Sequence, residues 1–591
     1  MYILGISCFY HDSAAALICG GKLIAAAEEE RFSRIKHDFS FPQRSITYCL
    51  EEAKITAKDL EYVVFYEKPF RKLDRILMTS FQNFPRSWRM FGEAMIEWFG
   101  DKLWMKNIIQ KRIGLEPDKI LFADHHLSHA SSAFYCSPFE EAAVLTLDGV
   151  GEWTTAATGR AKGNDIELLD EIRFPHSLGL LYSAFTAFLG FHVNEGEYKV
   201  MGMAPYGQPK YTDIITDKLV HIAEDGSFWI NMKYFAYHYS DKRAYNSKFT
   251  DLFGAPRDPK MHFFTSQSRF PSYFGEKPVD FNKQCRLNEH YADIAASIQK
   301  ITEEIILKLA VNLHRKTGLK KLCMAGGCAL NSMANGRILN ETPFEDLFIQ
   351  PAAGDSGGAL GAALHVYHAL LGKPRTFILE HVYYGKKYPE SDITSFLDGQ
   401  NIRYEYFSDD NKLIDRVVDD LVDQKVIGWY QGRFEWGPRA LGNRSILADP
   451  RSEIMKDKVN MKIKFREPFR PFAPVILEQN TDDFFVGRNT ARQYPSRFML
   501  FVLPLKEEKR DKVKAVNHLG TGRLQTIRQE WNSRYYNIVE RFGQATGVPV
   551  LLNTSFNLKG EPIVATPADA FSTFIKSGLD VLVLENYMVR K

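Results

Sequence analysis

The chain has 591 residues, of which 45% are hydrophobic and 25% are charged, and its net charge is +3. This length is too great for one hydrophobic core, so two or more globular domains are expected. So small a net charge over this length gives no reason to expect a nucleic-acid or membrane partner. The seven cysteines form no CxxC pair, which argues against a disulfide framework and against a cysteine-bound zinc site.

The N-terminal residues form a short strand-like run that lacks the basic start and cleavage site of a secretion signal. No apolar segment approaches the ~20 residues needed to span a bilayer. The sequence therefore predicts a cytoplasmic α/β protein.

Apolar runs typical of β-strands open the chain at residues 2–7, 13–18 and 22–27. The turn between the first two carries His11, Asp12 and Ser13. A hairpin tip with Asp and Ser suits a phosphate or metal-phosphate ligand, although most such tips are only turns.

A second strand-turn unit lies at residues 142–147, an apolar run that ends in Asp148 and Gly149. Two such units predict an internal duplication in which each half offers a loop to one cleft. Between the units, His125 and His129 are four residues apart and would project from one face of a helix. With Asp148 they make a plausible site for a divalent metal. Most helical histidine pairs only cap or pack, so the pair alone leaves both interpretations open.

Glycine-rich segments follow two later strand-like runs, at residues 322–325 and 347–350. After the first, glycines would let backbone amides approach a nucleotide closely. After the second, residues 354–371 predict a helix of small residues whose N-terminus faces phosphate, with Asp355 free to ligate a cation. The chain is then interrupted at residues 372–375, and we place a domain boundary after residue 375.

Four other segments receive coarser predictions. Residues 67–115 are aromatic, basic and helical in pattern, which indicates packing or a subunit interface. Residues 194–207 are rich in Gly and Lys and predict a substrate-facing loop. Residues 208–285 are a polar, aromatic insertion without a readable role, and residues 290–316 predict a helix.

The C-terminal part has a predicted strand at residues 426–430, followed by many Lys and Arg residues. Several of them are flanked by Gly, Pro or aromatic residues, which would hold their side chains in place, and they are more numerous than a solvent-exposed surface requires. These cations are Arg433, Arg439, Arg444, Lys464, Arg466, Arg470 and Arg523. Arginine forks match phosphate oxygens in pairs, so a triphosphate or an acyl phosphate is the expected guest. A nucleic-acid backbone would also suit them, but the low net charge and the absence of basic tracts disfavour it.

Four motifs together resemble the O-carbamoyltransferase family of the nodulation, cephamycin, tobramycin, novobiocin and saxitoxin pathways. They lie at residues 5–15, 125–130, 326–331 and 437–445. The resemblance covers nearly the whole chain in order. It implies a duplicated N-terminal domain of the actin/Hsp70/sugar-kinase superfold (Kae1-like) at 1–375 and a C-terminal YrdC-like twisted α/β domain at 376–591.

The resemblance implies ATP-dependent carbamoylation in two steps. In the YrdC-like domain, carbamoyl phosphate loses phosphate, and the carbamate attacks the α-phosphate of ATP to give carbamoyl-adenylate and pyrophosphate. A hydroxyl of a small-molecule natural product then attacks the carbamoyl carbon in the Kae1-like domain, and AMP leaves. Residues of the matching motifs would neutralise the phosphates and bind the adenylate: Arg439, Lys464, Arg470, Arg523 and Ser555 in the C-terminal domain, and Lys199, Gly326, Gly327 and Asn331 in the N-terminal domain.

The same resemblance implies a divalent metal, iron, held by His125, His129, Asp148 and Asp355, with Mg²⁺ accompanying ATP. His11 would take the proton from the hydroxyl, a general-base role suited to an unperturbed pKa near ~6.5, and Asp12 would orient it or contact the acceptor. His126 lies off the metal-facing side and is predicted to be structural. A homodimer is the family's habit.

Three alternatives remain open. A small-molecule kinase shares the N-terminal superfold, but most sugar kinases bind magnesium through carboxylates and lack a histidine pair. A tRNA threonylcarbamoyl transferase has related chemistry, but it usually keeps its two activities on separate chains. A nucleotide-binding scaffold without turnover would have no need of intact metal ligands and intact arginines.

Overall fold

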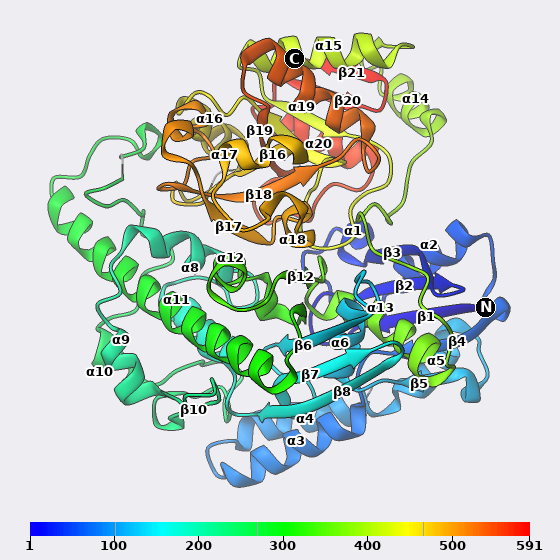
Figure 1. Cartoon of the computed structure of the whole chain (residues 1–591), viewed down its shortest axis with the longest axis vertical. Coiled ribbons are helices and arrows are strands. Elements are labelled where there is room, and N and C mark those ends of the chain that lie inside the picture. The colour runs from blue at the N-terminus through cyan, green and yellow to red at the C-terminus, as the bar shows by residue number, and fades with distance from the viewer. Residues whose placement is uncertain (101, 269, 465) are drawn as a thin grey trace.

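Two five-stranded sheets and one nine-stranded sheet form the framework of the protein (Figure 1). The structure is a computed structural model that describes residues 1–100, 102–268, 270–464 and 466–591. The two five-stranded sheets belong to the N-terminal part, in the lower half of Figure 1, and the nine-stranded sheet belongs to the C-terminal part above them. Among the described helices, none is both long enough and apolar enough to cross a bilayer.

The two N-terminal sheets have the same topology. The first has the order β3-β2-β1-β4-β5 and the second the order β8-β7-β6-β11-β12. In each, the central strand, β1 or β6, pairs antiparallel with the next strand in sequence and parallel with a later one. This repeat confirms the predicted duplication of an actin-like and sugar-kinase-like α/β fold. The strands are β1 (Tyr2–Ser7), β2 (Ala14–Cys19), β3 (Lys22–Glu28), β4 (Leu60–Phe65), β5 (Ile120–Phe122), β6 (Glu141–Leu147), β7 (Thr154–Lys162), β8 (Asp165–Arg173), β11 (Lys321–Ala325) and β12 (Asp346–Ile349).

Helices α6 (His125–Phe134) and α13 (Asp355–His365) pack together between the two sheets. Small residues permit an unusually close backbone approach. A Cβ on Gly5 of β1 would lie 1.8 Å from the carbonyl oxygen of Ala359, and a Cβ on Gly361 would lie 1.8 Å from that of Ser128. The glycines therefore set the distance between α13 and its two neighbours.

Of the other N-terminal helices, α2 (Gln43–Ala53) packs on β2 and β3, and α11 (Phe281–Thr317) packs on β6 and β7. The long helix α11 begins nine residues before the predicted helix start at residue 290. The 208–285 insertion contains short elements rather than a structureless loop. The other principal elements are α3 (Pro69–Gln82), α4 (Trp88–Gly100), α5 (Met105–Ile113), α7 (Leu178–Phe188), α9 (Thr212–Ile214), β9 (Val220–Ile222), β10 (Phe228–Ile230), α10 (Ser247–Phe253) and α12 (Ser332–Glu341).

The predicted loop at residues 194–207 is wrong over most of its length. Residues Glu197–Met203 form helix α8, and Ala204–Tyr206 continue it as a 3-10 turn. The residues Val200–Met203 are buried, because α8 packs on α7 and α11 and also touches the C-terminal part of the chain. A Cβ on Gly202 would lie 3.4 Å from Cδ of Pro471, an ordinary van der Waals distance. The two parts of the chain are therefore in direct contact at α8.

The C-terminal part is a mixed sheet with the order β13-β21-β20-β14-β15-β19-β16-β18-β17. Helices α15 (Asp410–Val422) and α19 (Ser533–Thr546) pack on it through one apolar cluster. This agrees with the predicted twisted α/β domain. The strands are β13 (Glu405–Tyr406), β14 (Ile427–Tyr430), β15 (Arg444–Ala448), β16 (Ala473–Leu477), β17 (Phe501–Pro504), β18 (Thr521–Ile527), β19 (Val550–Ser555), β20 (Val581–Leu584) and β21 (Tyr587–Arg590).

A buried polar contact joins the end of β3 to the loop that follows β14. The backbone N–H of Gly437 donates to Oε1 of Glu28 at 2.7 Å, and Nη2 of Arg31 donates to the carbonyl oxygen of Gly437 at 2.9 Å. Burial raises the pKa of Glu28 to about 7, although the positive charge of Arg31 opposes that rise. The other oxygen of Glu28, Oε2, is buried without a hydrogen-bond partner, as a protonated carboxyl tolerates better than a carboxylate does.

Because the Glu28 carboxyl keeps its proton in the folded protein, the free energy of unfolding should depend on pH. The Glu28→Gln substitution should remove this dependence. Between the unfolded pKa of ~4.3 and the folded value, only the folded protein keeps the proton, so wild-type stability falls as pH rises through this window, by up to about 3 kcal/mol. The glutamine stays neutral, so the melting temperature of the variant relative to wild type is expected to rise from about pH 5 to about pH 7. The exposed Glu167→Gln is the control. A constant difference over this range would contradict the prediction.

Candidate active site

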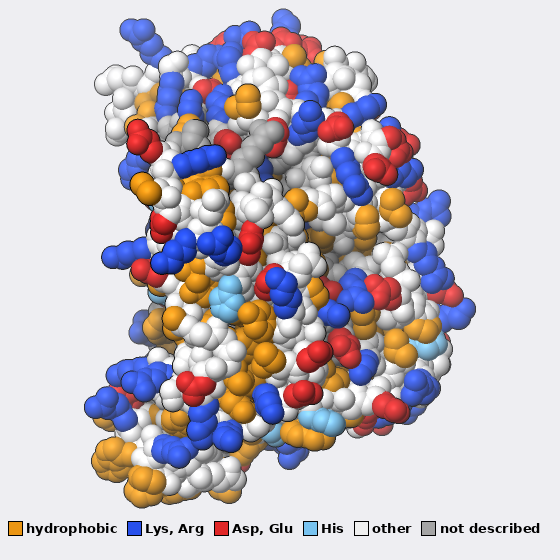
Figure 2. All heavy atoms as spheres, turned by 90° about the vertical axis from the view of Figure 1, so that its left-hand side faces the viewer, with side chains coloured by type: hydrophobic (Ala, Val, Ile, Leu, Met, Phe, Trp, Pro, Cys, Tyr) orange, Lys and Arg blue, Asp and Glu red, His pale blue; other side chains and the backbone are white. Residues whose placement is uncertain are grey.

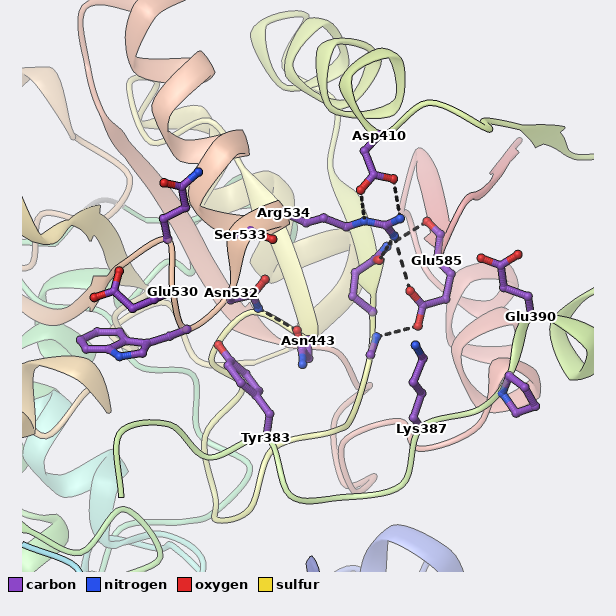
Figure 3. Close-up of a pocket in the computed structure, with 15 residues that line it drawn as sticks. Tyr383, Lys387, Glu390, Asp410, Asn443, Glu530, Asn532, Ser533, Arg534 and Glu585 are labelled. Carbon is purple, nitrogen blue, oxygen red and sulfur yellow. Dashed lines mark hydrogen bonds and ion pairs between the residues drawn. The ribbon is translucent and has the colours of Figure 1, made fainter. Parts of the chain in front are cut away.

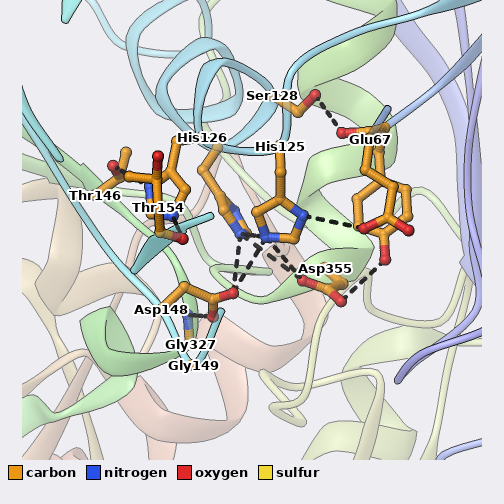
Figure 4. Close-up of polar contacts among 12 residues, drawn as sticks. Glu67, His125, His126, Ser128, Thr146, Asp148, Gly149, Thr154, Gly327 and Asp355 are labelled. Atoms are coloured by element: carbon orange, nitrogen blue, oxygen red, sulfur yellow. Dashed lines mark hydrogen bonds and ion pairs between the residues drawn. The ribbon is translucent and has the colours of Figure 1, made fainter. Parts of the chain in front are cut away.

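Four buried side chains from three elements converge between the two N-terminal sheets (Figure 4). His125 and His129 lie one turn apart on α6, Asp148 directly follows β6, and Asp355 begins α13. Their ligand atoms all lie within 4.8 Å of one another. Nε2 of His125 is 3.0 Å from Nε2 of His129 and 3.1 Å from Oδ2 of Asp148. The structure therefore brings together all four residues predicted to hold a metal.

Neighbouring groups fix the orientation of these ligands. The backbone N–H of Gly327 donates to Oδ1 of Asp148 at 3.0 Å, and the hydroxyl of Tyr66 donates to Oδ2 of Asp355 at 3.3 Å. Nδ1 of His125 lies 3.7 Å from Oε2 of Glu67. Each carboxylate thus keeps its other oxygen for the centre of the cluster, as outer partners do in metal sites.

The electrostatics of the cluster fit a cation. Burial opposes a charge on His125, but its contacts with Asp148 and Glu67 outweigh burial and raise its pKa well above the usual value. Burial would raise the pKa of Asp148, but hydrogen bonds to the two histidines lower it well below the usual value. Two imidazole nitrogens that face each other at 3.0 Å share one proton or one metal ion, and two histidines with two carboxylates suit a divalent transition metal. The donor set therefore fits the predicted metal.

His126 has a different environment, as predicted. Its Nδ1 lies 2.7 Å from Oγ1 of Thr146, and its Nε2 lies 2.9 Å from the carbonyl oxygen of Thr154. Burial and the neighbouring histidines lower its pKa to about 3. Both ring nitrogens are used, so this histidine holds α6 to the second sheet.

The turn between β1 and β2 presents His11 and Asp12 beside a residue that was not predicted, His37. Nδ1 of His11 and Nδ1 of His37 each lie 2.7 Å from a different oxygen of Asp12. Asp12 and His37 have φ values of 43° and 55°, a conformation that costs energy in residues other than glycine. Burial opposes a charge on His11, but Asp12 outweighs it and raises the pKa of His11 to about 9.

The N-terminal residues that were predicted to bind the adenylate differ in the contacts they make. Gly326 has φ 93°, and a Cβ there would lie 2.2 Å from the carbonyl oxygen of Leu147, so this glycine serves the backbone turn. The Asn331 amide pairs with Gln299 and caps α12. Nζ of Lys199 lies 3.5 Å from Oε1 of Glu467, in the C-terminal part.

A cationic cluster lies where α8 meets the C-terminal part. It contains Arg439, Lys464, Arg466, Arg470 and Arg523. Burial, and then the charges of three neighbouring arginines, lower the pKa of Arg523 well below its usual value. A guanidinium keeps its proton in proteins, so this crowding is a positive potential that favours a bound anion. Nε of Arg439 and Nε of Arg523 are buried without partners.

Residues of both parts line this cluster. Nη2 of Arg470 donates to the hydroxyl of Tyr198 at 3.0 Å, and Arg470 and Lys199 together lower the pKa of Tyr198 although burial opposes this. Nζ of Lys464 donates to Oδ1 of Asn557 at 2.8 Å and to Oγ of Ser555 at 3.2 Å. Lys464 and Ser555 are therefore in contact, as their shared predicted role requires.

Two of the seven cations found in the sequence have structural roles. Arg433 donates to the carbonyl oxygens of Ile24, Tyr384 and Gly385. Arg444 is buried, donates to nearby backbone carbonyls and lies 3.5 Å from the ring centre of Tyr430. Most donors of these two guanidinium groups are used by the protein, although Nε of Arg444 has no partner, so we do not place either arginine at the phosphates.

A separate cavity of about 760 Å³ opens on the C-terminal part (Figure 3). Tyr383, Asn443 and Arg534 are among its lining residues, and none of the predicted site residues is. Arg534 donates to Asp410 at 2.6 Å and to Gln431 at 2.7 Å. Its charge is paired within the protein, so we do not place the reaction in this cavity.

Sequence reasoning missed several residues that support the site. Glu67 lies shortly after β4, so the pattern that identified Asp148, a carboxylate at the end of a strand, would also have identified Glu67. Glu152 accepts from the backbone N–H of His125 at 3.1 Å, and no pattern pointed to it. His37 and Tyr198 also lacked a signal, since their roles depend on contacts between segments distant in sequence.

Two family models and several relatives match the chain. The models described as carbamoyltransferase N-terminus and carbamoyltransferase C-terminus match residues 2–364 and 418–591. An uncharacterised protein of Synechocystis is 45% identical over 100% of this chain and 97% of its own length. The nodulation protein NolNO of Sinorhizobium fredii is 37% identical over 99% of this chain and 79% of its own length. The crystal structure of T. kodakarensis HypF, 14% identical, covers 63% of this chain and 48% of that one with a TM-score of 0.32, from which we conclude nothing.

The four-residue cluster predicts metal binding that depends on His129. His129→Ala is expected to lower the affinity for a divalent metal by at least about a hundredfold, because removing a ligand costs more than removing an outer partner does. Competition of ferrous ion, manganese and zinc against a coloured chelator measures this affinity. His365→Ala, which changes a histidine outside the cluster, is the control and should bind as wild type does. Equal affinity in both variants would exclude the cluster as the metal site.

Proposed function

The chain belongs to the carbamoyltransferase family and is an enzyme of carbamoyl transfer, and from this premise we propose that it carbamoylates a small-molecule hydroxyl in two ATP-dependent steps. Residues 376–591 form carbamoyl-adenylate, and residues 1–375 transfer the carbamoyl group. One observation carries this division: a partly buried cationic cluster and a buried His/Asp cluster lie in different parts of the chain. Polyphosphate chemistry needs the first, and transfer near a metal needs the second.

The first step uses cations rather than a nucleophilic side chain. Water converts carbamoyl phosphate into carbamate and phosphate, and a carbamate oxygen then attacks the α-phosphorus of ATP while pyrophosphate leaves. Arg439, Arg470 and Arg523 bind the phosphates through their guanidinium forks. Lys464 holds the carbamoyl group, and Ser555, which lies 3.2 Å from its ammonium, contacts the adenylate.

The second step takes place at the turn after β1. His11 accepts the proton of the acceptor hydroxyl at Nε2, because Asp12 occupies its Nδ1. The hydroxyl oxygen attacks the carbamoyl carbon, and the bond to AMP breaks. His37 holds the second oxygen of Asp12 and so limits how that carboxylate can turn. Gly326 and Gly327 form the turn beside Asp148, and we propose that the adenylate lies against this turn, with Lys199 and Asn331 nearby.

His125, His129, Asp148 and Asp355 would hold the metal, for which we propose iron, with Mg²⁺ on ATP. When bound, this metal supplies positive charge that attracts the adenylate phosphate. The acceptor is a hydroxyl compound of natural-product biosynthesis.

Phosphorus NMR of stoichiometric enzyme with ATP and magnesium, with and without carbamoyl phosphate, tests the proposal. We expect pyrophosphate and an AMP-linked product only when carbamoyl phosphate is present. ADP in place of pyrophosphate would support a small-molecule kinase instead. No turnover under either condition would favour the nucleotide-binding scaffold.

Two substitutions separate the steps. Arg439→Ala is expected to reduce carbamoyl-adenylate formation by at least about a hundredfold, because it removes a buried charge that faces the phosphates. His125→Ala is expected to spare adenylate formation and to abolish transfer. Burst-phase pyrophosphate release measures the first step, and carbamoylated product formed from preformed carbamoyl-adenylate measures the second.

The exposed Arg160→Ala and the distant His365→Ala are the matched controls, and each should keep both steps. Equal loss of both steps in Arg439→Ala and His125→Ala would disprove the two-site division.

The raised pKa of His11 predicts a specific pH profile for transfer. Only the neutral imidazole accepts a proton, so kcat/KM should rise with pH until about 9. Asp12→Asn removes the carboxylate that stabilises the imidazolium. The apparent pKa of the rising part of the kcat/KM profile should therefore fall by more than about one unit, toward the unperturbed ~6.5. A steady-state profile with preformed carbamoyl-adenylate checks this. An unmoved limb in Asp12→Asn would show that His11 is not the titrating base.

A further inference from the structure

Helix α3 buries two of its charged residues and exposes two of its phenylalanines. Lys72 and Arg75 are only 6% and 8% exposed, whereas Phe70 and Phe81 are 71% and 67% exposed. A surface helix normally buries its large apolar residues and exposes its charged ones. The outer face of α3 therefore carries large apolar side chains beside the exposed Arg71 and Asp74.

Specific contacts hold these charges inside. Nζ of Lys72 lies 2.7 Å from Oε2 of Glu67, and the guanidinium of Arg75 lies 5.1 Å from the ring centre of Phe174. Asp74 accepts a hydrogen bond from Nε1 of Trp153 at 3.1 Å. The orientation of α3 is thus fixed by its own polar contacts, and its phenylalanines have no alternative inward position.

The apolar surface continues beyond α3 into the following loop, α4 and the short turn before α5. Large apolar side chains on these segments are more exposed than buried, and we call them together the aromatic face: Phe70, Phe81, Phe84, Trp88, Ile96, Phe99 and Trp104. In Figure 1 α3 and α4 lie at the lower edge, and in Figure 2 hydrophobic side chains gather beside Lys and Arg at that end. Contiguous exposed aromatic residues of this kind mark an interaction surface.

Positive charge is concentrated in the same segment. Residues 69–113 contain nine Lys or Arg and four Asp or Glu, a net charge of +5, so the rest of the chain carries −2 of the total of +3. Averaged over the whole chain, the charge gave no reason to expect a membrane partner. Arg71, Arg86 and Arg89 are exposed on the segments that carry the aromatic rings, whereas Lys72 and Arg75 are buried.

We propose that the aromatic face docks on the surface of an anionic lipid bilayer. Phenylalanine and tryptophan rings favour the level of the lipid headgroups, and arginines such as Arg86 and Arg89 would meet the lipid phosphates. A second copy of this chain is a poorer occupant, because a two-fold contact would place a +5 segment against another +5 segment.

Docking would bring the metal cluster close to the bilayer. The inner face of α3 contacts Glu67 through Lys72, and Glu67 lies 3.7 Å from Nδ1 of His125. The aromatic face and the metal cluster are thus separated by one helix and one carboxylate. This inference does not depend on the identity of the reaction.

Flotation of the full-length chain with lipid vesicles tests the proposal. We expect binding to vesicles of phosphatidylcholine with about one third phosphatidylglycerol, weak binding to phosphatidylcholine alone, and release by salt. The double variant Phe81→Ser and Trp88→Ser should bind at least about tenfold more weakly, because it removes the rings that enter the interface. Arg86→Glu with Arg89→Glu should lose the preference for anionic vesicles.

Ile454→Ser, which removes a side chain 75% exposed on α16 (Ile454–Val459) of the C-terminal part, is the matched control and should bind as wild type does. Circular dichroism and the melting temperature verify that the variants are folded. Absence of binding to anionic vesicles at low salt would overturn the proposal, as would equal binding by the aromatic variant. A dimer that this variant converts into monomers would show that the face is a self-interface instead.

Discussion

The close backbone contact of α13 with β1 and α6 is the constraint on which the metal cluster depends. At Gly5 and at Gly361 any side chain would overlap a carbonyl oxygen of the neighbouring element, since a Cβ would lie 1.8 Å away. This spacing places the first residue of α13, Asp355, opposite the two histidines of α6. A wider helix pair would separate the carboxylate from the imidazoles, and the residues would lose their shared centre.

A second constraint acts where α8 meets the C-terminal part. Partly buried cations repel one another, and the five that gather in one region are compensated in part by Tyr198 and Glu467. Tyr198 and Lys199 come from the N-terminal part, so both parts of the chain contribute to this region. For the proposed reaction, this arrangement gives a physical reason for the two steps to share one polypeptide.

The two centres have opposite electrostatic character. The metal cluster places carboxylates against imidazoles, so it attracts a cation, while the arginine cluster attracts polyanions. In the proposed reaction, the adenylate formed at the second centre carries a phosphate that would suit the charge of a metal at the first. The buried Glu28 contact and the backbone-bound Arg433 hold the two parts in register, and neither residue needs to take part in the chemistry.

The sequence alone predicted the strands, the duplication, the four residues that converge as candidate metal ligands, and the cationic character of the C-terminal part. Each of these follows from local pattern: apolar runs, a spacing of four between His125 and His129, and a carboxylate after a strand. Only the tertiary structure decided that Arg433 binds carbonyl groups while Arg439 stays without a partner at Nε, and that residues 197–203 form a helix. It alone turned Lys72 and Arg75 of α3 inward. These outcomes depend on contacts between residues far apart in the chain, which no local pattern encodes.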